Sequence, residues 1–269
     1  MPDAQTLCRD LKRIRDEAPL VHNITNYVVM NTTANALLSL GASPVMAHAA
    51  EEVEAMVAIS RALVVNIGTL SKPWIKSMHK AVREAKKRGI PWMLDPVGAG
   101  ATRLRTETAA ALLKEGAPAV IRGNASEIMA LHGSATAGLT KGVASVHGSE
   151  AALNSARHLA KTWKCVVSIS GKVDLITDGK TVVRVLNGDP LMPRVTGLGC
   201  AATAITGAFI AVNPNFLEAA SHAMGIMGIA GEMAVEKAAG PGTLQLHFLD
   251  ALYQINDDDI IKRLRMETA

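Results

Sequence analysis

Four short runs of apolar residues, separated by helix-like segments, constrain the fold of this chain more than any other feature. Strands that are apolar along their whole length are typical of a parallel sheet whose two faces are both covered by helices. The pattern therefore predicts an α/β fold with a central, mostly parallel sheet flanked by helices on both faces. The runs are Ala62–Ile67, Ile90–Leu94, Ala119–Ile121 and Cys165–Ile169, and helices are expected over Ser71–Gly89, Thr106–Lys114, Ser126–Leu131 and Ser149–Trp163.

The segments on either side complete this prediction. Apolar spacing predicts an amphipathic helix over Asp3–Glu17, and a second helix capped by Thr25 or Asn26 and ending at Leu40. We find no internal repeat or linker in the 269 residues and expect a single domain over 1–269. The other expected elements are a strand over Ser43–Ala47, a helix over Glu51–Ser60, a hairpin of Asp174–Thr177 and Thr181–Val185, and helices over Gly199–Val212, Phe216–Ala238, Gly242–Ile255 and Asp257–Met266.

Composition and charge exclude several classes of partner. The net charge is only +4, and the basic residues are mixed with acidic ones, so we expect solvated helix faces and no nucleic-acid partner. The three cysteines, Cys8, Cys165 and Cys200, are odd in number and lack metal-ligand spacing, so we expect neither a structural zinc nor a disulfide framework. Met1–Pro19 has no apolar run of a signal peptide, and together these points favour the reducing cytoplasm. Val195–Val212 is uncharged over about the length of a membrane span, but it is rich in Gly, Ala and Thr, so we expect a buried helix and no membrane partner.

Polar and glycine-rich residues follow each predicted strand. In an open α/β sheet, ligands bind beyond the carboxyl ends of the strands, so these residues are expected to line one rim. They are Gly68-Thr69, Asp95–Gly100, Arg122–Asn124 with Glu127, and Ser168–Lys172.

Two acidic residues on this rim have both a local and a functional interpretation. Asp95 precedes a proline, where it favours a turn, and Asn124 with Glu127 has the spacing of a helix capping box. Alternatively, the two carboxylates could hold Mg²⁺, which takes oxygen ligands. Their expected position on one rim favours a metal site, without excluding the capping box.

A glycine turn opens the uncharged helix. Gly197, Leu198, Gly199 and Cys200 would place unpaired amides and the positive end of a helix dipole beside a ligand, which predicts a phosphate site. Together with Ala202, the two glycines also match a degenerate dinucleotide fingerprint. That interpretation is rejected because no strand directly precedes the motif. A P-loop ATPase is excluded as well, because the sequence contains no P-loop motif. Cys200 is either a small core residue or a thiol at a helix start.

A cluster of polar residues near the N-terminus also has two interpretations. His22, Asn23, Asn26 and Asn31 are interspersed with apolar residues. They are either part of a polar surface loop or one wall of a pocket.

Six motifs in order along nearly the whole chain resemble those of the hydroxyethylthiazole kinase family of the ribokinase-like superfamily. A single motif would not be specific, but six in the right order are. They are Val21–Val29, Leu40–Met46, Asn66–Leu70, Leu94–Ala99, Arg122–Ile128 and Gly197–Cys200.

The resemblance implies a ribokinase-like fold and a homotrimer with active sites at subunit interfaces. It also implies Mg²⁺-dependent transfer of the ATP γ-phosphoryl group to the primary hydroxyl of 4-methyl-5-(2-hydroxyethyl)thiazole, in thiamine salvage or biosynthesis. By the same resemblance, Met46, Gly197, Asn26 and Gly68 are expected to contact the alcohol, Arg122, Ser168 and Asn124 to contact ATP, and Asp95 and Glu127 to hold magnesium.

One departure from the wider superfamily concerns the catalytic position. Ribokinase-like enzymes commonly carry Asp after the last glycine of the anion loop, whereas this chain has Cys200, as the thiazole kinases do. We expect Cys200 to orient or partly deprotonate the alcohol, while charge neutralisation supplies most of the catalysis. The alternatives are a hydroxymethylpyrimidine or pyridoxal kinase, an ATP-dependent dehydratase of nicotinamide hydrates, which typically has Asp at this position, and a non-catalytic binder.

Overall fold

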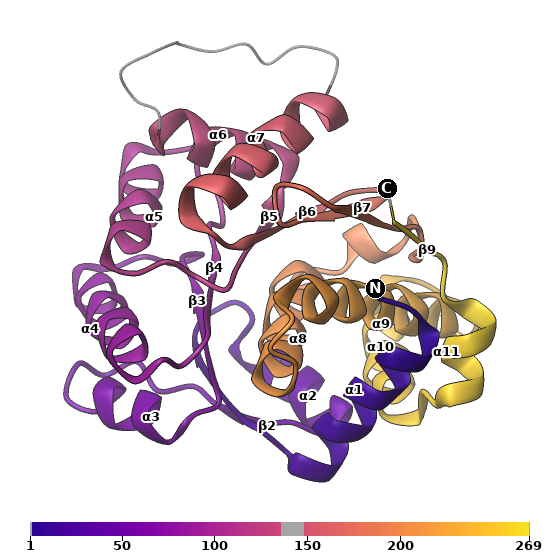
Figure 1. Cartoon of the computed structure of the whole chain (residues 1–269). Coiled ribbons are helices and arrows are strands. Elements are labelled where there is room, and N and C mark those ends of the chain that lie inside the picture. Colours follow the sequence, from indigo (N-terminus) through magenta and orange to yellow (C-terminus); the bar gives the residue numbers. More distant parts are fainter. Residues whose placement is uncertain (1, 136–147, 269) are drawn as a thin grey trace.

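A nine-stranded sheet runs through the computed structural model, which describes residues 2–135 and 148–268. The strand order is β2-β1-β3-β4-β5-β6-β7-β8-β9; the first six strands are parallel, and the last three join as antiparallel neighbours (Figure 1). The predicted α/β class with a mostly parallel sheet is confirmed. The strands are β1 (Leu20–Ile24), β2 (Ser43–Val45), β3 (Ala62–Asn66), β4 (Trp92–Asp95), β5 (Val120–Asn124), β6 (Val166–Ser170), β7 (Asp174–Thr177), β8 (Val182–Val185) and β9 (Met266–Thr268).

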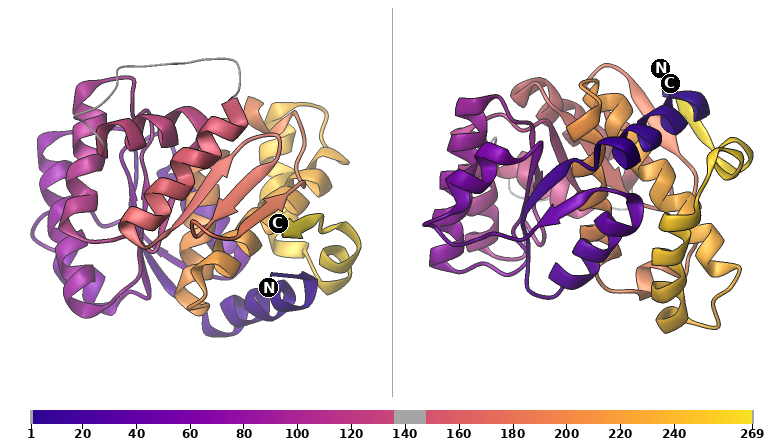
Figure 2. Two further views of the ribbon diagram at one scale, coloured as in Figure 1. Left: turned by 45° about the horizontal axis from the view of Figure 1, so that its top comes forward. Right: turned by 90° about the horizontal axis from the view of Figure 1, so that it is seen from below.

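Helices cover both faces of the sheet, as Figures 1 and 2 show. Leu63 and Val65 of β3 point into the core beneath α3 to α7, whereas Ala62 and Val64 point into the core shared by α1, α2 and α8 to α10. This alternation is the period of a strand with both faces buried. The helices are α1 (Ala4–Glu17), α2 (Met30–Leu40), α3 (Val53–Ile59), α4 (Lys72–Arg88), α5 (Arg103–Glu115), α6 (Ala125–Ala135), α7 (Gly148–Trp163), α8 (Leu198–Val212), α9 (Phe216–Val235), α10 (Pro241–Gln254) and α11 (Asp257–Arg263), with a 3₁₀ turn η1 at Met192–Arg194.

The uncharged helix α8 is central to the second core. Its residues are buried almost throughout, against β1, β3 and β4 on one side and α9 on the other. Gly207 allows this close approach, since a Cβ there would lie 2.6 Å from Val64 Cγ2. The expected buried helix is confirmed. Across residues 2–135 and 148–268, every helix is too short or too polar to cross a membrane.

Two strands, β1 and β9, were not predicted from the sequence. β1 was not predicted, because His22 and Asn23 interrupt its apolar pattern, yet both side chains are buried between β2 and β3. His22 Nε2 lies 2.6 Å from the Ala47 carbonyl, and Asn23 Nδ2 donates to the Val21 carbonyl at 2.9 Å. These two hydrogen bonds offset part of the cost of burying the polar groups, while His22 Nδ1 and Asn23 Oδ1 have no partner within the described residues.

The other errors lie at element ends. The helix expected from Thr25 or Asn26 begins only at Met30, so these two residues form a turn beyond β1. The helix expected over Asp257–Met266 ends at Arg263, and the chain then forms β9 along the edge strand β8.

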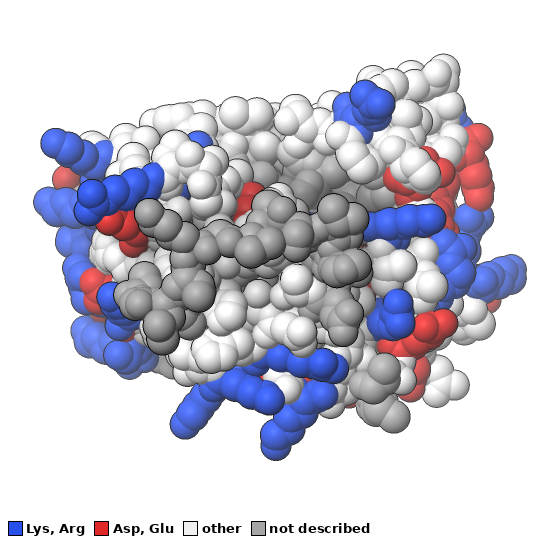
Figure 3. Space-filling view, turned by 90° about the horizontal axis from the view of Figure 1, so that it is seen from above, with Lys and Arg blue, Asp and Glu red and all other residues white. Residues whose placement is uncertain are grey.

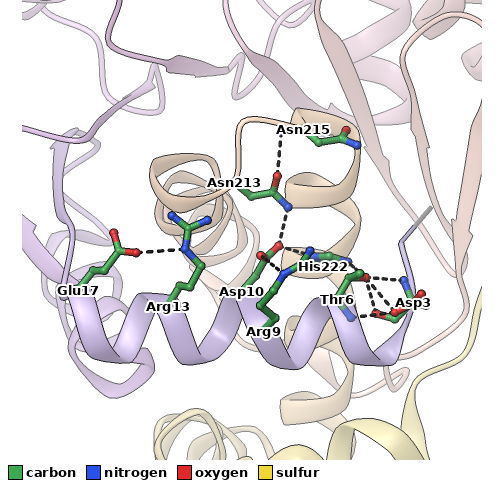
Figure 4. Close-up of polar contacts among 9 residues, drawn as sticks. All are labelled: Asp3, Thr6, Arg9, Asp10, Arg13, Glu17, Asn213, Asn215 and His222. Carbon is green, nitrogen blue, oxygen red and sulfur yellow. Dashed lines mark hydrogen bonds and ion pairs between the residues drawn. The ribbon is translucent and has the colours of Figure 1, made fainter.

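A buried polar cluster joins the first helix to the second core (Figure 4). His222 Nδ1, on α9, donates to Asp10 Oδ2 on α1 at 2.8 Å, and Asn213 Nδ2 donates to the same oxygen at 2.6 Å. Thr6 Oγ1 lies 3.2 Å from His222 Nε2. Burial alone would raise the pKa of Asp10, but the hydrogen bonds from His222 and Asn213 outweigh it and lower that pKa. The cluster therefore favours an ionised Asp10 and holds α1 in place.

Candidate functional site

The carboxyl ends of β3 and β4 bring two polar side chains together. Asn66 and Asp95 are register partners, and Asn66 Nδ2 donates to Asp95 Oδ2 at 2.7 Å. Thr203 of α8 donates to the same oxygen through Oγ1 at 2.7 Å. The first turns of α8 are thereby joined to the rim of the sheet.

Asp95 is buried at the base of this rim. Burial raises the pKa of its carboxyl to about 6, while the positive charge of Arg122 is the largest of the influences that oppose the rise. The negative charge of Glu127 raises the same pKa further, so the two carboxylates are close enough to interact. A cation between them would relieve both the burial cost and the repulsion.

Arg122 connects β5 to α8 and β6. Its Nη1 donates to the Gly199 carbonyl at 2.8 Å and to Thr203 Oγ1 at 3.2 Å, and its Nη2 donates to Ser170 Oγ at 2.7 Å. The side chain is buried, and Nε lacks a partner within the described residues. Arg122 therefore carries a positive charge beside the start of α8, where it can still bind an anion.

The start of α8 has the geometry of an anion site. Gly197 caps the helix with φ +90°, a left-handed conformation that side chains rarely adopt, and a Cβ there would lie 3.0 Å from Val29 Cγ1. Gly199 has open space where a Cβ would be. The backbone amides of this first turn therefore remain accessible from the open side.

Cys200 faces the ends of β1 and β3. Asn26 Nδ2 and Asn66 Nδ2 donate to its Sγ at 3.4 Å and 3.2 Å, and Asn26 Nδ2 also donates to Asn66 Oδ1 at 2.9 Å. Burial raises the pKa of the Cys200 thiol, and the neighbouring Asp95 raises it further. The sulfur is thus held as a neutral thiol at neutral pH, in spite of its place at a helix start.

The capping box predicted for Asn124 and Glu127 is present. Asn124 Oδ1 accepts from the Glu127 amide at 3.0 Å, and Glu127 Oε2 accepts from the Asn124 amide at 2.8 Å. Glu127 Oε1 accepts from the Gly98 amide at 2.8 Å, so this side chain also fixes the turn after β4. Both interpretations remain compatible, because a carboxylate oxygen can accept a hydrogen bond and bind a cation.

A cavity of about 860 Å³ opens beside these residues. Arg122 and the Gly197–Gly199 turn form its polar end, and the loop after β8 together with α9 forms its apolar wall. Its volume is within the range of cofactor-sized ligand sites. The apolar wall consists of Leu186, Pro190, Met192, Pro193, Val195, Met224 and Met227, with Asn187, Gly188 and Gly228 between them.

Ser168 and Ser170 occupy different environments on β6. Ser168 was the expected ATP contact, but it is fully buried and its Oγ has no partner within the described residues. Ser170, two residues further on, lines the cavity and accepts from Arg122. Both serines face the same side of the sheet, because alternate residues of a strand do. Ser170 is accessible because it is the last residue of β6, whereas Ser168 lies within the buried part of the strand.

Of the residues expected to contact the alcohol, Gly197 lines the cavity, whereas Asn26, Gly68 and Met46 lie outside its lining. Gly68 packs against the Asn26 amide, where a Cβ would lie 2.6 Å from Asn26 Nδ2. Met46 follows the edge strand β2, next to β1, and is half-buried. Asn26, Gly68 and Cys200 therefore form one group, and Met46 is on the same edge of the sheet but outside that group.

Three residues of the site were not predicted. Asn66, the hub between Asn26, Cys200 and Asp95, ends an apolar strand, and this position was the available signal. Thr203 had no distinguishing pattern within an uncharged helix. Arg105 of α5 donates to the carbonyls of Ile67, Val97 and Gly68 and so joins the turns after β3 and β4, a contact between distant segments that no local pattern indicates.

Surface charge agrees with the interpretation of solvated helix faces. On the face in Figure 3, the Lys and Arg side chains lie mainly along the outer edge of the molecule, with Asp and Glu among them. On exposed helices, several charges pair within one helical turn, as Lys12 with Asp16 and Arg103 with Glu107 do.

Comparisons with known proteins show which family the sequence resembles. The sequence profile of the hydroxyethylthiazole kinase family matches residues 11–258. A hydroxyethylthiazole kinase of Syntrophus aciditrophicus is 58% identical over 95% of this chain and 94% of its own length. One from Nitratidesulfovibrio vulgaris is 54% identical over 99% of both chains.

Solved structures give the same result for the fold. The hydroxyethylthiazole kinase of Pyrococcus horikoshii superposes with a TM-score of 0.91 at 44% identity, over 98% of this chain and 99% of that one. The pyridoxal kinase of Staphylococcus aureus, in complex with AMP-PCP, has a TM-score of 0.65 at 14% identity, over 93% and 98% of the two chains. At that identity the second likeness concerns the fold alone, which is ribokinase-like.

Proposed function

Because this chain belongs to the hydroxyethylthiazole kinase family, we propose that it transfers the γ-phosphoryl group of ATP to the primary hydroxyl of 4-methyl-5-(2-hydroxyethyl)thiazole. The observation that carries the proposal is the cavity, which leads from an apolar wall to a helix start flanked by Arg122 and Asp95. The reaction would serve thiamine salvage or biosynthesis.

The cavity accounts for the nucleotide. Its apolar wall, with Met224 and Met227, suits an adenine base, and the amides of the Gly197–Gly199 turn suit the phosphates. Arg122 neutralises phosphate charge from the side of β5, where Ser170 accepts a hydrogen bond from it at the cavity, and Ser168 stays a proposed ATP contact on the same strand. Asn124 contributes through the turn that it caps.

The alcohol would bind on the opposite side of the glycine turn. Asn26, Gly68 and Cys200 surround that position, and Met46 approaches from the end of β2. The hydroxyl would then face Gly197 and the transferred phosphoryl group. Tyr27 and Val28 beside it are 63% and 64% exposed, which supports a second subunit covering this side.

Asp95 and Glu127 suit Mg²⁺. They supply two carboxylates at one rim, and the negative charge of Glu127 raises the pKa of Asp95. Mg²⁺ is usually bound by one or two carboxylates together with phosphates and waters. When bound, the ion would neutralise phosphate charge. No cluster of three or more metal-ligating side chains occurs within the described residues, so phosphates and waters would complete its ligands.

Charge neutralisation and positioning account for the catalysis that we propose for this chain. Arg122 and the first amides of α8 stabilise the charge on the transferred group, which carries most of the catalytic effect in phosphoryl transfer. Cys200 orients the hydroxyl rather than deprotonating it, because burial raises the pKa of its thiol. Asn66 holds Cys200 at a fixed distance from Asp95.

Three further parts of the proposal come from the sequence. The chain forms a homotrimer with active sites at subunit interfaces, it folds as a single domain over 1–269, and it works in the cytoplasm. Continuity of one sheet from β2 to β9 supports the single domain.

A panel of alcohols tests the proposed function. ADP release is followed with ATP, Mg²⁺ and either the thiazole alcohol, hydroxymethylpyrimidine or pyridoxal, and the phosphorylated product is identified by mass spectrometry. We expect the thiazole alcohol to give the highest kcat/KM. Faster turnover of either other alcohol would identify a sister kinase. Free phosphate released with a hydrated nicotinamide nucleotide would identify the dehydratase, and binding without any product would identify a binder.

A further inference from the structure

The apolar wall of the cavity is a loop that packs on α9. This wall loop, residues 186–196, runs from the end of β8 to the glycine turn. Gly228 and Gly231 of α9 leave it the space that it needs, since a Cβ on Gly228 would lie 2.7 Å from the Asn187 carbonyl carbon and one on Gly231 would lie 2.6 Å from Met192 Cε. The position of the wall loop therefore depends on its contact with this helix.

Glu232, one turn beyond Gly228, accepts several hydrogen bonds from the wall loop. Its Oε1 accepts from the Gly188 amide at 2.8 Å, and Asn187 Nδ2 donates to both carboxylate oxygens at 3.2 and 3.3 Å. Arg265 Nη2 donates to Oε1 at 2.6 Å. The Glu232 side chain is only 16% exposed, so this ion pair is screened less than a surface pair would be.

The C-terminal segment holds the same loop from the other side. Arg265 donates through its amide to Asn187 Oδ1 at 2.7 Å and through Nη2 to the Leu186 carbonyl at 3.0 Å. The Leu186 amide donates to the Arg265 carbonyl at 2.9 Å, and Asn187 Nδ2 donates to the Arg263 carbonyl at 2.7 Å. The chain then continues into β9, beside β8 (Figure 1).

We propose that Glu232 and Arg265 are positioning residues for the nucleotide. Together with Asn187 they form a C-terminal clasp that holds the wall loop in place on α9, so that the loop and the helix present one apolar wall to an adenine base. Neither Glu232 nor Arg265 lines the cavity, so both act through the loop. The inference rests on the proposed function, because it takes the cavity as the ATP site.

The substitution Glu232→Gln tests the clasp. It keeps the size of the side chain but removes the charge that Arg265 and two loop groups bind. We expect KM for ATP to rise at least about fivefold, with kcat at saturating ATP and KM for the alcohol within about twofold of the wild type. Arg265→Gln, at a side chain that is 56% exposed, should change the same constant in the same direction while leaving the fold intact.

Glu236→Gln is the matched control. Glu236 follows α9 one turn after Glu232 and pairs with Arg263 of the same C-terminal segment, but its partners lie outside the wall loop. We expect this variant to retain the wild-type KM for ATP. Arg265→Lys, which keeps the charge, should lie between the wild type and Arg265→Gln.

Two different failures can be distinguished by equilibrium dialysis of each protein with ATP. If the wild-type protein binds no ATP, the proposed function is wrong. If it binds ATP and both Glu232→Gln and Arg265→Gln bind with unchanged affinity, the clasp is overturned. An equal loss in Glu236→Gln would also overturn it, because it would show a general effect of C-terminal ion pairs.

Discussion

At the residue scale, Asp95 combines a function with a cost to stability. Its pKa of about 6 in the folded protein lies above the ordinary value of 3.8, so ionisation favours the unfolded chain. The cost is fully present above about pH 6 and disappears as the pH falls toward 3.8. Such a cost is expected where a carboxylate must be buried to hold a cation.

Asp95→Asn therefore should stabilise the fold and abolish activity. The amide oxygen can still accept from Asn66 and Thr203, and removal of the charge should increase the free energy of unfolding by on the order of 1–3 kcal/mol at pH 7.5 without metal. Thermal unfolding in EDTA measures this difference, which should decrease as the pH falls from 6 to 4. A variant that is less stable than the wild type at pH 7.5 would contradict the argument.

The Cys200→Ala variant measures how much the thiol contributes to catalysis. If Cys200 orients the alcohol, its removal should lower kcat/KM by about tenfold, far less than Asp95→Asn does. Cys200→Asp should retain or improve turnover, because a carboxylate is the better base. Equal losses from Cys200→Ala and Asp95→Asn would show that the thiol is essential.

The places of residues on the rim were predicted from sequence where the end of a strand or the start of a helix marked them. Asp95, Arg122 and the glycine turn were found because they follow apolar strands or open a helix. The place of Ser170 beside Arg122 was not accessible in this way, since it depends on where β6 passes out of the core. Asn66 ends an apolar strand as Asp95 does, but its role as a hub could not be predicted, because its partners come from three separate segments.

At the element scale, glycine at the start of α8 has two effects: it lowers the stability of the helix, and it leaves space for a phosphate. Gly199→Ala adds a methyl group to open space in the first helical turn, where Ala is favoured over Gly by about 0.5–1 kcal/mol. The melting temperature should stay equal or rise, while KM for ATP rises at least about tenfold because the methyl group occupies the phosphate position.

Gly242→Ala is the control for this prediction. Gly242 is the second residue of α10, as Gly199 is of α8, and a Cβ there also meets open space, but it lies outside the cavity. It should gain similar stability with unchanged kinetics. A Gly199→Ala enzyme with wild-type KM for ATP would place the phosphates elsewhere.

The polar cluster that holds α1 should make stability depend on acid. Because the pKa of Asp10 is lowered in the folded protein, the stability that it contributes is fully present above 3.8 and is lost as the pH falls below that value. Asp10→Ala should cost about 3–5 kcal/mol at neutral pH and flatten the acid limb of the stability curve. Asp16→Ala, on the exposed side of the same helix, should change stability by less than about 1 kcal/mol, as measured by urea unfolding.

Elements with an uninterrupted apolar pattern were predicted from sequence, and the exceptions have physical causes. β1 carries His22 and Asn23, whose partners are a carbonyl of another segment and one two residues back. β9 comes after α11, which begins with three acidic residues. Nothing in this local sequence indicates that the chain forms a strand after the helix ends at Arg263. Its pairing with β8 is a tertiary contact, and local propensity does not encode it.

At the scale of the whole molecule, the exposed side of the alcohol site predicts assembly. Val28 is 64% exposed next to Asn26, and a second subunit would bury it. Light scattering should give the mass of three chains, and Val28→Glu should give a smaller mass with loss of activity. Ile261→Glu, at an equally exposed position on α11, should remain assembled and active. A fully active monomer would refute shared active sites.

The first helix of the chain completes its packing on the last ones. α1 lies against α8, α9 and α11, and α1 and α11 are side by side in Figures 1 and 2. A nascent polypeptide consequently emerges from the ribosome with the apolar stripe of Leu7, Leu11 and Ile14 still in water. α1 also contacts α2, but its other partners, α8, α9 and α11, lie between residues 198 and 263, so the core around α1 is completed only after these helices have been synthesised.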